Sequence, residues 1–234
     1  MNFIRNWAKN VFVNANTIRY RIELRVMNHL INDHCGGRLG DNLLDAGAGS
    51  GEISLRLMQS GVCSSIFAIE PYEENYLKLE ASYRNIPRTR TSRDSLDRIP
   101  VRDSEMDALI STQVFEHIED DEAAAKEVAR VLKSGGYAII TTPHPPEIFP
   151  NDGHVRPGYT EEQMRALFEP LSLTWLGTEY FFILPTLRRL TAAMELGVFG
   201  RLLTISWADR EVGMSNAERK SQQPYGIACI FRKQ

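Results

Sequence analysis

The sequence predicts a doubly wound α/β fold, in which a parallel sheet carries helices on both faces. Short apolar segments typical of buried strands alternate with longer amphipathic segments between residues 38 and 178. A glycine-rich turn at residues 45–51 joins the first of these strands to the helix that follows it. Because alternation of this kind places strands side by side with right-handed crossovers, a parallel sheet is expected.

The elements are assigned in chain order. A leading helix is expected over residues 17–34, because the apolar side chains of Ile18, Ile22 and Val26 recur every four residues. Strands are then expected at 43–46, 65–70, 89–93, 106–112, 137–142, 171–178 and 225–232. Helices are expected at 50–59, at 72–83, at 121–132 and from Thr160, where Gln163 three residues later completes a capping box.

The composition is that of an ordinary globular protein. Of the 234 residues, 43% are hydrophobic and 24% are charged, and the net charge of −3 provides no general basic field for nucleic acid. Cys35, Cys63 and Cys229 are widely spaced, which argues against a disulfide framework or a zinc site and suits a reducing cytoplasm. The N-terminal residues lack a signal-peptide core, and no uninterrupted apolar run reaches ~18 residues. We therefore expect a cytoplasmic protein without stable membrane insertion.

The turn at residues 45–51 indicates the kind of ligand. Glycine permits positive φ and lets a ligand approach the backbone, and the start of a helix offers unpaired N–H groups. A dinucleotide fingerprint, G-x-G-x-x-G, would place its third glycine at position 52, where this chain has Glu52. The glycines stand instead at positions 47, 49 and 51, after Asp45.

This spacing resembles the first motif of the class I S-adenosylmethionine (SAM)-dependent methyltransferases, and the chain looks closest to the small-molecule enzymes often called type 11. Three further segments carry the resemblance: the strand end at Glu70, the stretch 107–118 and the glycine turn in 131–137. The resemblance covers roughly residues 38–178 and the final strand. It implies a Rossmann-like, seven-stranded sheet that is mostly parallel with an antiparallel last strand. It also implies SAM as the cofactor and S-adenosylhomocysteine as the product.

Cofactor-binding residues are expected at four strand ends. An acidic residue at the tip of the second strand accepts hydrogen bonds from ribose hydroxyls in nucleotide-binding folds, which assigns Glu70, and the ring of Tyr72 could pack on adenine. The resemblance implies the remaining contacts: Asp45, Gly47, Ala48, Gly49 and Gly51 in the turn, Pro71 after Glu70, Asp94 and Ser95 toward the adenine, and Gln113 and Val114 beneath the methionine part. Asp97 and Asp103 stay open as alternatives to Asp94. Asp45 holds the turn or lies near the ammonium group of the cofactor.

Histidines are the candidates for a general base, which methyl transfer needs when the acceptor is a hydroxyl. His154 and His144 lie in the proline-rich loop after the fifth strand, and His117 lies within the stretch 107–118, which includes the fourth strand. We favour His154 over His144, and His117 is also a candidate for a pocket wall. His144, Glu147 and Asp152 have no compact ligand spacing, so no metal is expected.

A single domain is expected over residues 1–234. Residues 1–37 would form N-terminal cap helices, and residues 38–178 with 224–234 the core. Residues 180–223 would form a helical insertion that packs on the sheet, closes over substrate as a lid, forms a homodimer interface or docks on a membrane surface.

The predicted function is SAM-dependent methyl transfer to a small-molecule acceptor, with O-methylation of a biosynthetic intermediate preferred. The strand-four stretch lacks the N/D-P-P-Y/F motif that grips a flipped base, which argues against a nucleobase substrate and a nucleic-acid partner. Two alternatives stay open: a non-catalytic binding or regulatory protein with the same fold, and a nucleotide-cofactor oxidoreductase.

Overall fold

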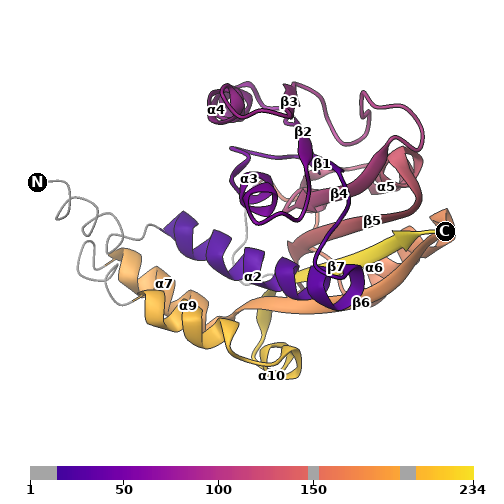
Figure 1. The fold of residues 1–234 in the computed structure, drawn as a ribbon. Coiled ribbons are helices and arrows are strands. Elements are labelled where there is room, and N and C mark those ends of the chain that lie inside the picture. Colours follow the sequence, from indigo (N-terminus) through magenta and orange to yellow (C-terminus); the bar gives the residue numbers. More distant parts are fainter. Residues whose placement is uncertain (1–14, 147–152, 196–203) are drawn as a thin grey trace, which may run out of the picture.

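In the computed structural model, the described residues are 15–146, 153–195 and 204–234. They form a seven-stranded sheet in the order β3-β2-β1-β4-β5-β7-β6, flanked by helices (Figure 1). Residues 1–14 of the predicted cap region 1–37, residues 196–203 of the predicted insertion 180–223, and the loop residues Glu147 and Asp152 lie outside the described residues. The strands are β1 (Asn42–Ala46), β2 (Ser65–Ile69), β3 (Thr89–Ser92), β4 (Met106–Thr112), β5 (Leu132–Pro143), β6 (Leu173–Ile183) and β7 (Pro224–Lys233).

The predicted strand directions, mostly parallel with an antiparallel last strand, are confirmed. β1 pairs in parallel with β2 and β4, β2 with β3, and β4 with β5. β7, the last strand in the chain, runs antiparallel to both of its neighbours, β5 and β6. From β1 the chain adds β2 and β3 on one side of the sheet and then returns to add β4 and β5 on the other side, so the strand order reverses between β1 and β4. Ligands of doubly wound folds bind in the crevice at such a reversal.

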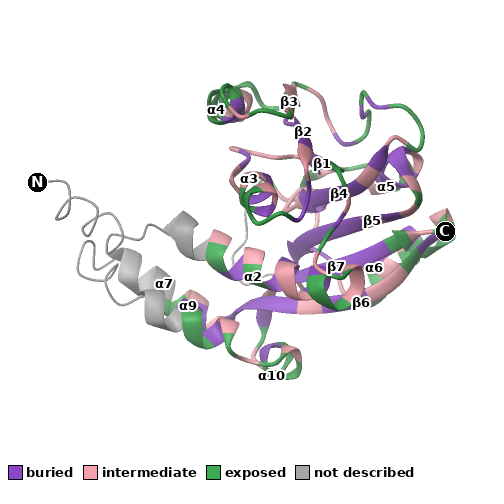
Figure 2. Cartoon of the chain, in the orientation of Figure 1, coloured by how far each residue is buried: buried purple, intermediate pink, exposed green. Residues whose placement is uncertain are grey.

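Helices cover both faces of the sheet. They are α2 (Ala15–Cys35), α3 (Glu52–Gln59), α4 (Glu73–Tyr83), α5 (Asp121–Val131), α6 (Glu161–Phe168), α7 (Leu184–Glu195), α9 (Thr204–Val212) and α10 (Asn216–Lys220), with short 3-10 turns η1 (Phe115–His117) and η2 (Glu169–Leu171). Buried side chains of α2, α3, α4 and α9 share one hydrophobic cluster, and those of α5 and α6 share the other. Figure 2 shows the strands between them largely buried.

Successive side chains of each central strand contribute alternately to the two hydrophobic clusters. In β1, Leu43 packs into the cluster with α2 and α3, and Leu44 packs into the cluster on the opposite face. Ile139 and Ile140 in β5 divide in the same way. Since successive side chains of a strand point to opposite faces, a strand that is apolar at every position is buried on both sides.

Two strands, β5 and β6, extend well beyond their predicted ranges because of irregular or antiparallel pairing. β5 begins at Leu132 rather than at 137, because Leu132 pairs with Met106 before a register shift in β4. β6 continues to Ile183, where Ile183 pairs with Pro224, so the first four residues of the predicted insertion belong to the sheet. Among the described helices, none combines the length and apolar character needed to cross a membrane.

Candidate cofactor and acceptor site

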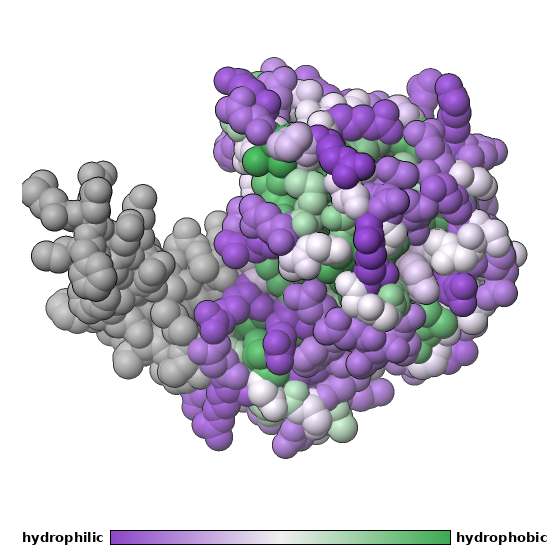
Figure 3. Space-filling view, viewed as in Figure 1, coloured by the Kyte–Doolittle hydropathy of each residue, from purple (hydrophilic) through white to green (hydrophobic). Residues whose placement is uncertain are grey.

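A cavity of about 710 Å³ opens at the carboxyl ends of β1, β2 and β4, at the point where the strand order reverses. On the face of the molecule that Figure 3 draws, apolar side chains are visible between hydrophilic ones. A volume of this size is within the range of ~300–1,000 Å³ typical of small-molecule and cofactor sites. The cavity is therefore the candidate functional site.

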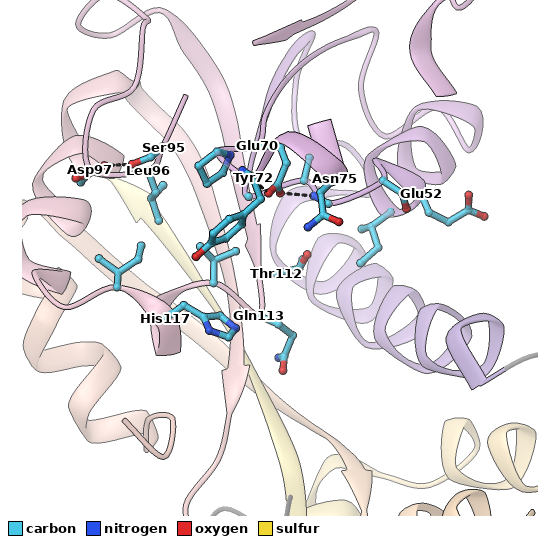
Figure 4. Close-up of a pocket in the computed structure, with 18 of the residues that line it drawn as sticks. Glu52, Glu70, Tyr72, Asn75, Ser95, Leu96, Asp97, Thr112, Gln113 and His117 are labelled. Atoms are coloured by element: carbon cyan, nitrogen blue, oxygen red, sulfur yellow. Dashed lines mark hydrogen bonds between the residues drawn. The ribbon is translucent and has the colours of Figure 1, made fainter. Parts of the chain in front are cut away.

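Most of the residues predicted from the sequence line this cavity (Figure 4). Those that line it are Gly47, Ala48, Gly49, Glu70, Pro71, Ser95, Gln113, Val114 and His117. Asp45, Gly51, Asp94, His144 and His154 lie outside its lining. Asn75 and Leu96 line it without having been singled out, since an amide on a helix and a leucine in a loop carry no distinguishing sequence pattern.

The glycine turn lets the backbone pass close to the cavity. Gly49 has a φ of 57°, and a Cβ added there would meet no described atom within 4 Å. Gly51 has a φ of 77°, and a Cβ there would lie 2.4 Å from the Tyr83 ring, so this position has no room for a side chain. The turn is thus packed on its α4 side at Gly51 and unobstructed at Gly49.

Glu70 joins the turn to the end of β2. Its side chain is only 4% exposed, and one carboxylate oxygen accepts a hydrogen bond from the Gly49 N–H at 2.9 Å. The other oxygen accepts from the Tyr72 N–H at 3.1 Å. An ionised carboxylate offers about four acceptor positions, so two remain for ligand hydroxyls after these two bonds.

Asp45 supports the turn from behind. Its side chain is 1% exposed, and it accepts a hydrogen bond from the Ser54 hydroxyl, whose oxygen lies 2.6 Å from the Tyr83 hydroxyl. The second oxygen, Oδ1, is buried and accepts no hydrogen bond from the described residues. Burial raises the pKa of Asp45 to about 7, against the opposing effect of the Ser54 bond. The carboxyl therefore braces α3 against β1 and carries a proton over much of the acidic range.

The loop after β3 presents Ser95, Leu96 and Asp97 to the cavity. The Ser95 hydroxyl donates to the Asp97 carboxylate, as the dashed line in Figure 4 marks. Asp94 instead accepts a hydrogen bond from the Ser92 hydroxyl and lines a neighbouring hollow. Of the three carboxylates considered for the adenine end, Asp94, Asp97 and Asp103, Asp97 is the one that lines the cavity.

At the end of β4, Gln113 has a φ of 56°, a conformation that few residues other than glycine adopt. Its N–H donates to the Thr141 carbonyl at 2.9 Å, and its amide nitrogen lies 3.4 Å from the Thr141 hydroxyl. That hydroxyl donates to the buried Glu23 of α2 at 2.8 Å. A chain of polar contacts from α2 through β5 therefore helps to hold Gln113 in its strained position on the cavity wall.

The three candidate histidines occupy two places. His144 packs against Tyr180, with ring centroids 5.5 Å apart, and burial lowers the pKa of its imidazole. His117 and His154 lie together, with ring centroids 4.8 Å apart and planes at 74°. Only His117 of these three reaches the cavity lining among the described residues.

Comparison with known proteins agrees with this geometry. Residues 44–140, from β1 through β5, match the family model described as a methyltransferase domain. The segment from β1 through β5 is therefore similar to a methyltransferase domain. The matched segment contains the glycine turn, Glu70 and the end of β4.

Two relatives are similar to this chain over part of their length. An uncharacterized methyltransferase of Mycobacterium tuberculosis is 35% identical over 94 residues, which are 40% of this chain and 36% of that protein. A probable SAM-dependent methyltransferase of the same species is 27% identical over 122 residues, 52% of this chain and 43% of that protein. The match thus spans less than half the length of these relatives.

Solved structures share the fold at low identity. A 4+2 cyclase, SpnF, aligns with a TM-score of 0.63 over 89% of this chain and 81% of its own, at 19% identity. Because that neighbour is named for a cyclization, the shared fold by itself does not specify the reaction.

Proposed function

We propose that this chain transfers a methyl group from SAM to the hydroxyl of a small-molecule acceptor. The observation that carries the proposal is the pairing of the Gly49 N–H with a buried Glu70 at the rim of a cavity of about 710 Å³. Glu70 retains acceptor positions for two ribose hydroxyls, and Gly49 leaves the space beside them open. These residues fit the cofactor that the family uses.

When bound, the cofactor supplies an activated methyl carbon on a sulfonium, so the protein mainly has to align the acceptor and exclude water. The turn at Gly49 and the loop at Leu96 and Asp97 would hold the nucleoside part. Gln113 and Val114 would then face the reacting centre from the end of β4. Alignment of this kind lowers a barrier by roughly 7–11 kcal/mol in well-oriented systems.

Acceptor specificity would reside outside the matched segment 44–140. Among the described residues, the loop before Tyr159 and the helices α7, α9 and α10 are neither part of the family match nor part of the cavity lining. We assign to them the lid or interface role, and a homodimer through α7 and α9 is one form of it.

The test uses SAM labelled in its methyl group and a panel of small phenols, hydroxy acids and amines. Transfer of label to at least one hydroxyl acceptor, lost in Glu70→Ala, is the expected result. Transfer only to amines would contradict O-methylation while leaving the cofactor assignment in place. If Glu70→Ala transferred the labelled methyl group to the acceptor as fast as the wild type does, the assignment of Glu70 to the cofactor site would be wrong.

A further inference from the structure

A cluster of three potential metal ligands lies beside the cavity, at the junction of η1 and the loop that precedes α6. One oxygen of Glu116 and one nitrogen each of His117 and His154 all lie within 4.8 Å of one another. His117 also lines the cavity, so the cluster borders the space in which the acceptor would bind. Two imidazoles and one carboxylate form a donor set that suits divalent transition metals.

The fold holds the two segments of the cluster together. The Val155 N–H donates to the Glu116 carbonyl at 2.9 Å, which fixes His154 beside η1. Arg156 donates to the Glu119 carbonyl at 2.9 Å. The Tyr159 hydroxyl donates to the Asp121 carboxylate at 2.6 Å. These bonds pin the loop after His154 to the segment that follows η1, so the three side chains lie near one another before any ion arrives.

The hydrogen bond of His117 orients its ring for metal binding. Its Nδ1 lies 2.8 Å from the Gly153 carbonyl oxygen, which can only accept a hydrogen bond. Nδ1 therefore carries the proton, and Nε2 keeps the lone pair that a cation requires. A ligating histidine almost always donates its other N–H to a carbonyl or carboxylate in this way.

Glu116 contributes the negative charge in a shielded position. The residue is 1% exposed, and water therefore screens its attraction for a cation only weakly. The three ligand atoms would have to draw closer to reach the ~2.0–2.2 Å bonds of an occupied site. Movement of the His154 loop by about an ångström would bring them there, since metal–ligand distances of this size place ligand atoms ~3.5 Å apart.

We propose that Glu116, His117 and His154 bind one divalent transition-metal ion, of the Zn²⁺ type, with a remaining coordination position open to the cavity. This differs from the sequence-based expectation of no metal. The sequence separates the cluster's histidines by 37 positions, so only the folded structure brings them together.

The ion would activate the acceptor, an inference that rests on the proposed methyl transfer. A hydroxyl bound to a divalent cation loses its proton more readily, and that proton passes to solvent water. The acceptor oxygen then forms the bond to the methyl carbon, and the carbon–sulfur bond breaks with its electron pair left on sulfur. Such an ion would replace a general base.

The experiment is a calorimetric titration of the full chain, first stripped with a chelator, with Zn²⁺. One ion per chain is expected, with affinity lowered at least tenfold in His117→Ala and in His154→Ala. His144→Ala is the matched control, because His144 lies outside the cluster, and it should bind as the wild type does. Zn²⁺ should also raise the melting temperature of the wild type and of His144→Ala but not that of the cluster variants.

Two results would overturn the proposal. One is a wild-type protein that binds SAM but takes up no Zn²⁺; the other is uptake that persists unchanged in the double variant His117→Ala/His154→Ala. If the histidines only anchor the loop, their replacement lowers the melting temperature equally with and without Zn²⁺. Because the Zn²⁺ titration contains no SAM, its outcome is independent of whether the proposed methyl transfer is correct.

Discussion

At the scale of single residues, Glu70 carries the proposed cofactor contact. Replacing it with alanine removes a charged acceptor, and hydrogen bonds to charged groups are worth about 1.5–3 kcal/mol. SAM affinity of Glu70→Ala should therefore fall by roughly 10- to 150-fold, measured by calorimetry on the folded variant. Glu74→Ala is the control and should bind SAM normally, because the exposed Glu74 carboxylate pairs with Lys78 one turn along the same helix, α4. Unchanged affinity in folded Glu70→Ala would remove Glu70 from the site.

Asp45 makes a prediction about pH. Because its folded-state pKa of about 7 lies above the ordinary value of 3.8, the folded protein holds a proton that the unfolded chain releases between these values. The stability that this carboxyl contributes is therefore greatest below pH 3.8, falls as the pH rises toward 7 and then levels off. Asp45→Asn keeps the side chain neutral and should be more stable than the wild type at pH 8, by up to roughly 4 kcal/mol.

Urea unfolding at pH 5 and pH 8 checks this prediction. The free-energy advantage of Asp45→Asn over the wild type should be larger at pH 8 than at pH 5. Asp33→Asn, a substitution of an exposed residue on α2, should show no such change with pH. An advantage that is equal at both pH values would mean that Asp45 is ionised throughout.

At the scale of elements, two glycines of the turn have different roles: Gly51 is needed for packing, and Gly49 leaves room for a ligand. Gly51→Ala forces a Cβ to within 2.4 Å of the Tyr83 ring at a φ of 77°, so it should destabilise the fold by roughly 2–4 kcal/mol. Gly49→Ala meets no described atom and should cost only the strain of its φ of 57°, about 1–2 kcal/mol. Denaturation measures the first effect, and SAM titration shows whether Gly49→Ala loses affinity as well. Equal destabilisation by the two substitutions would contradict this division.

The sequence predicted the elements that rest on local patterns. The extent of β4, residues 106–112, agrees with its prediction, and Thr160 with Gln163 forms the expected capping box at the start of α6. The end of β6 at Ile183 and the start of β5 at Leu132 were missed, because both depend on pairing with distant strands. The meeting of His117 with His154 depends on tertiary structure in the same way.

At the scale of the whole molecule, the family match and the proposed cofactor site coincide, while the acceptor side lies beyond them. The match ends at residue 140, near the end of β5, before the loop that carries His154 and before the helices α7, α9 and α10. Several residues that line the cavity could be predicted, because glycines and an acid at strand ends are what a nucleoside ligand requires. The acceptor half has no such shared chemistry, since each acceptor needs its own pocket.

The central claim is that the cavity at the β1–β4 reversal binds SAM, and a calorimetric titration of the full chain tests it most directly. SAM and S-adenosylhomocysteine should each bind once per chain with micromolar affinity, and NADH should not bind. Binding of NADH in their place, or of none of the three, would contradict the assignment of Glu70 and the glycine turn to this cofactor.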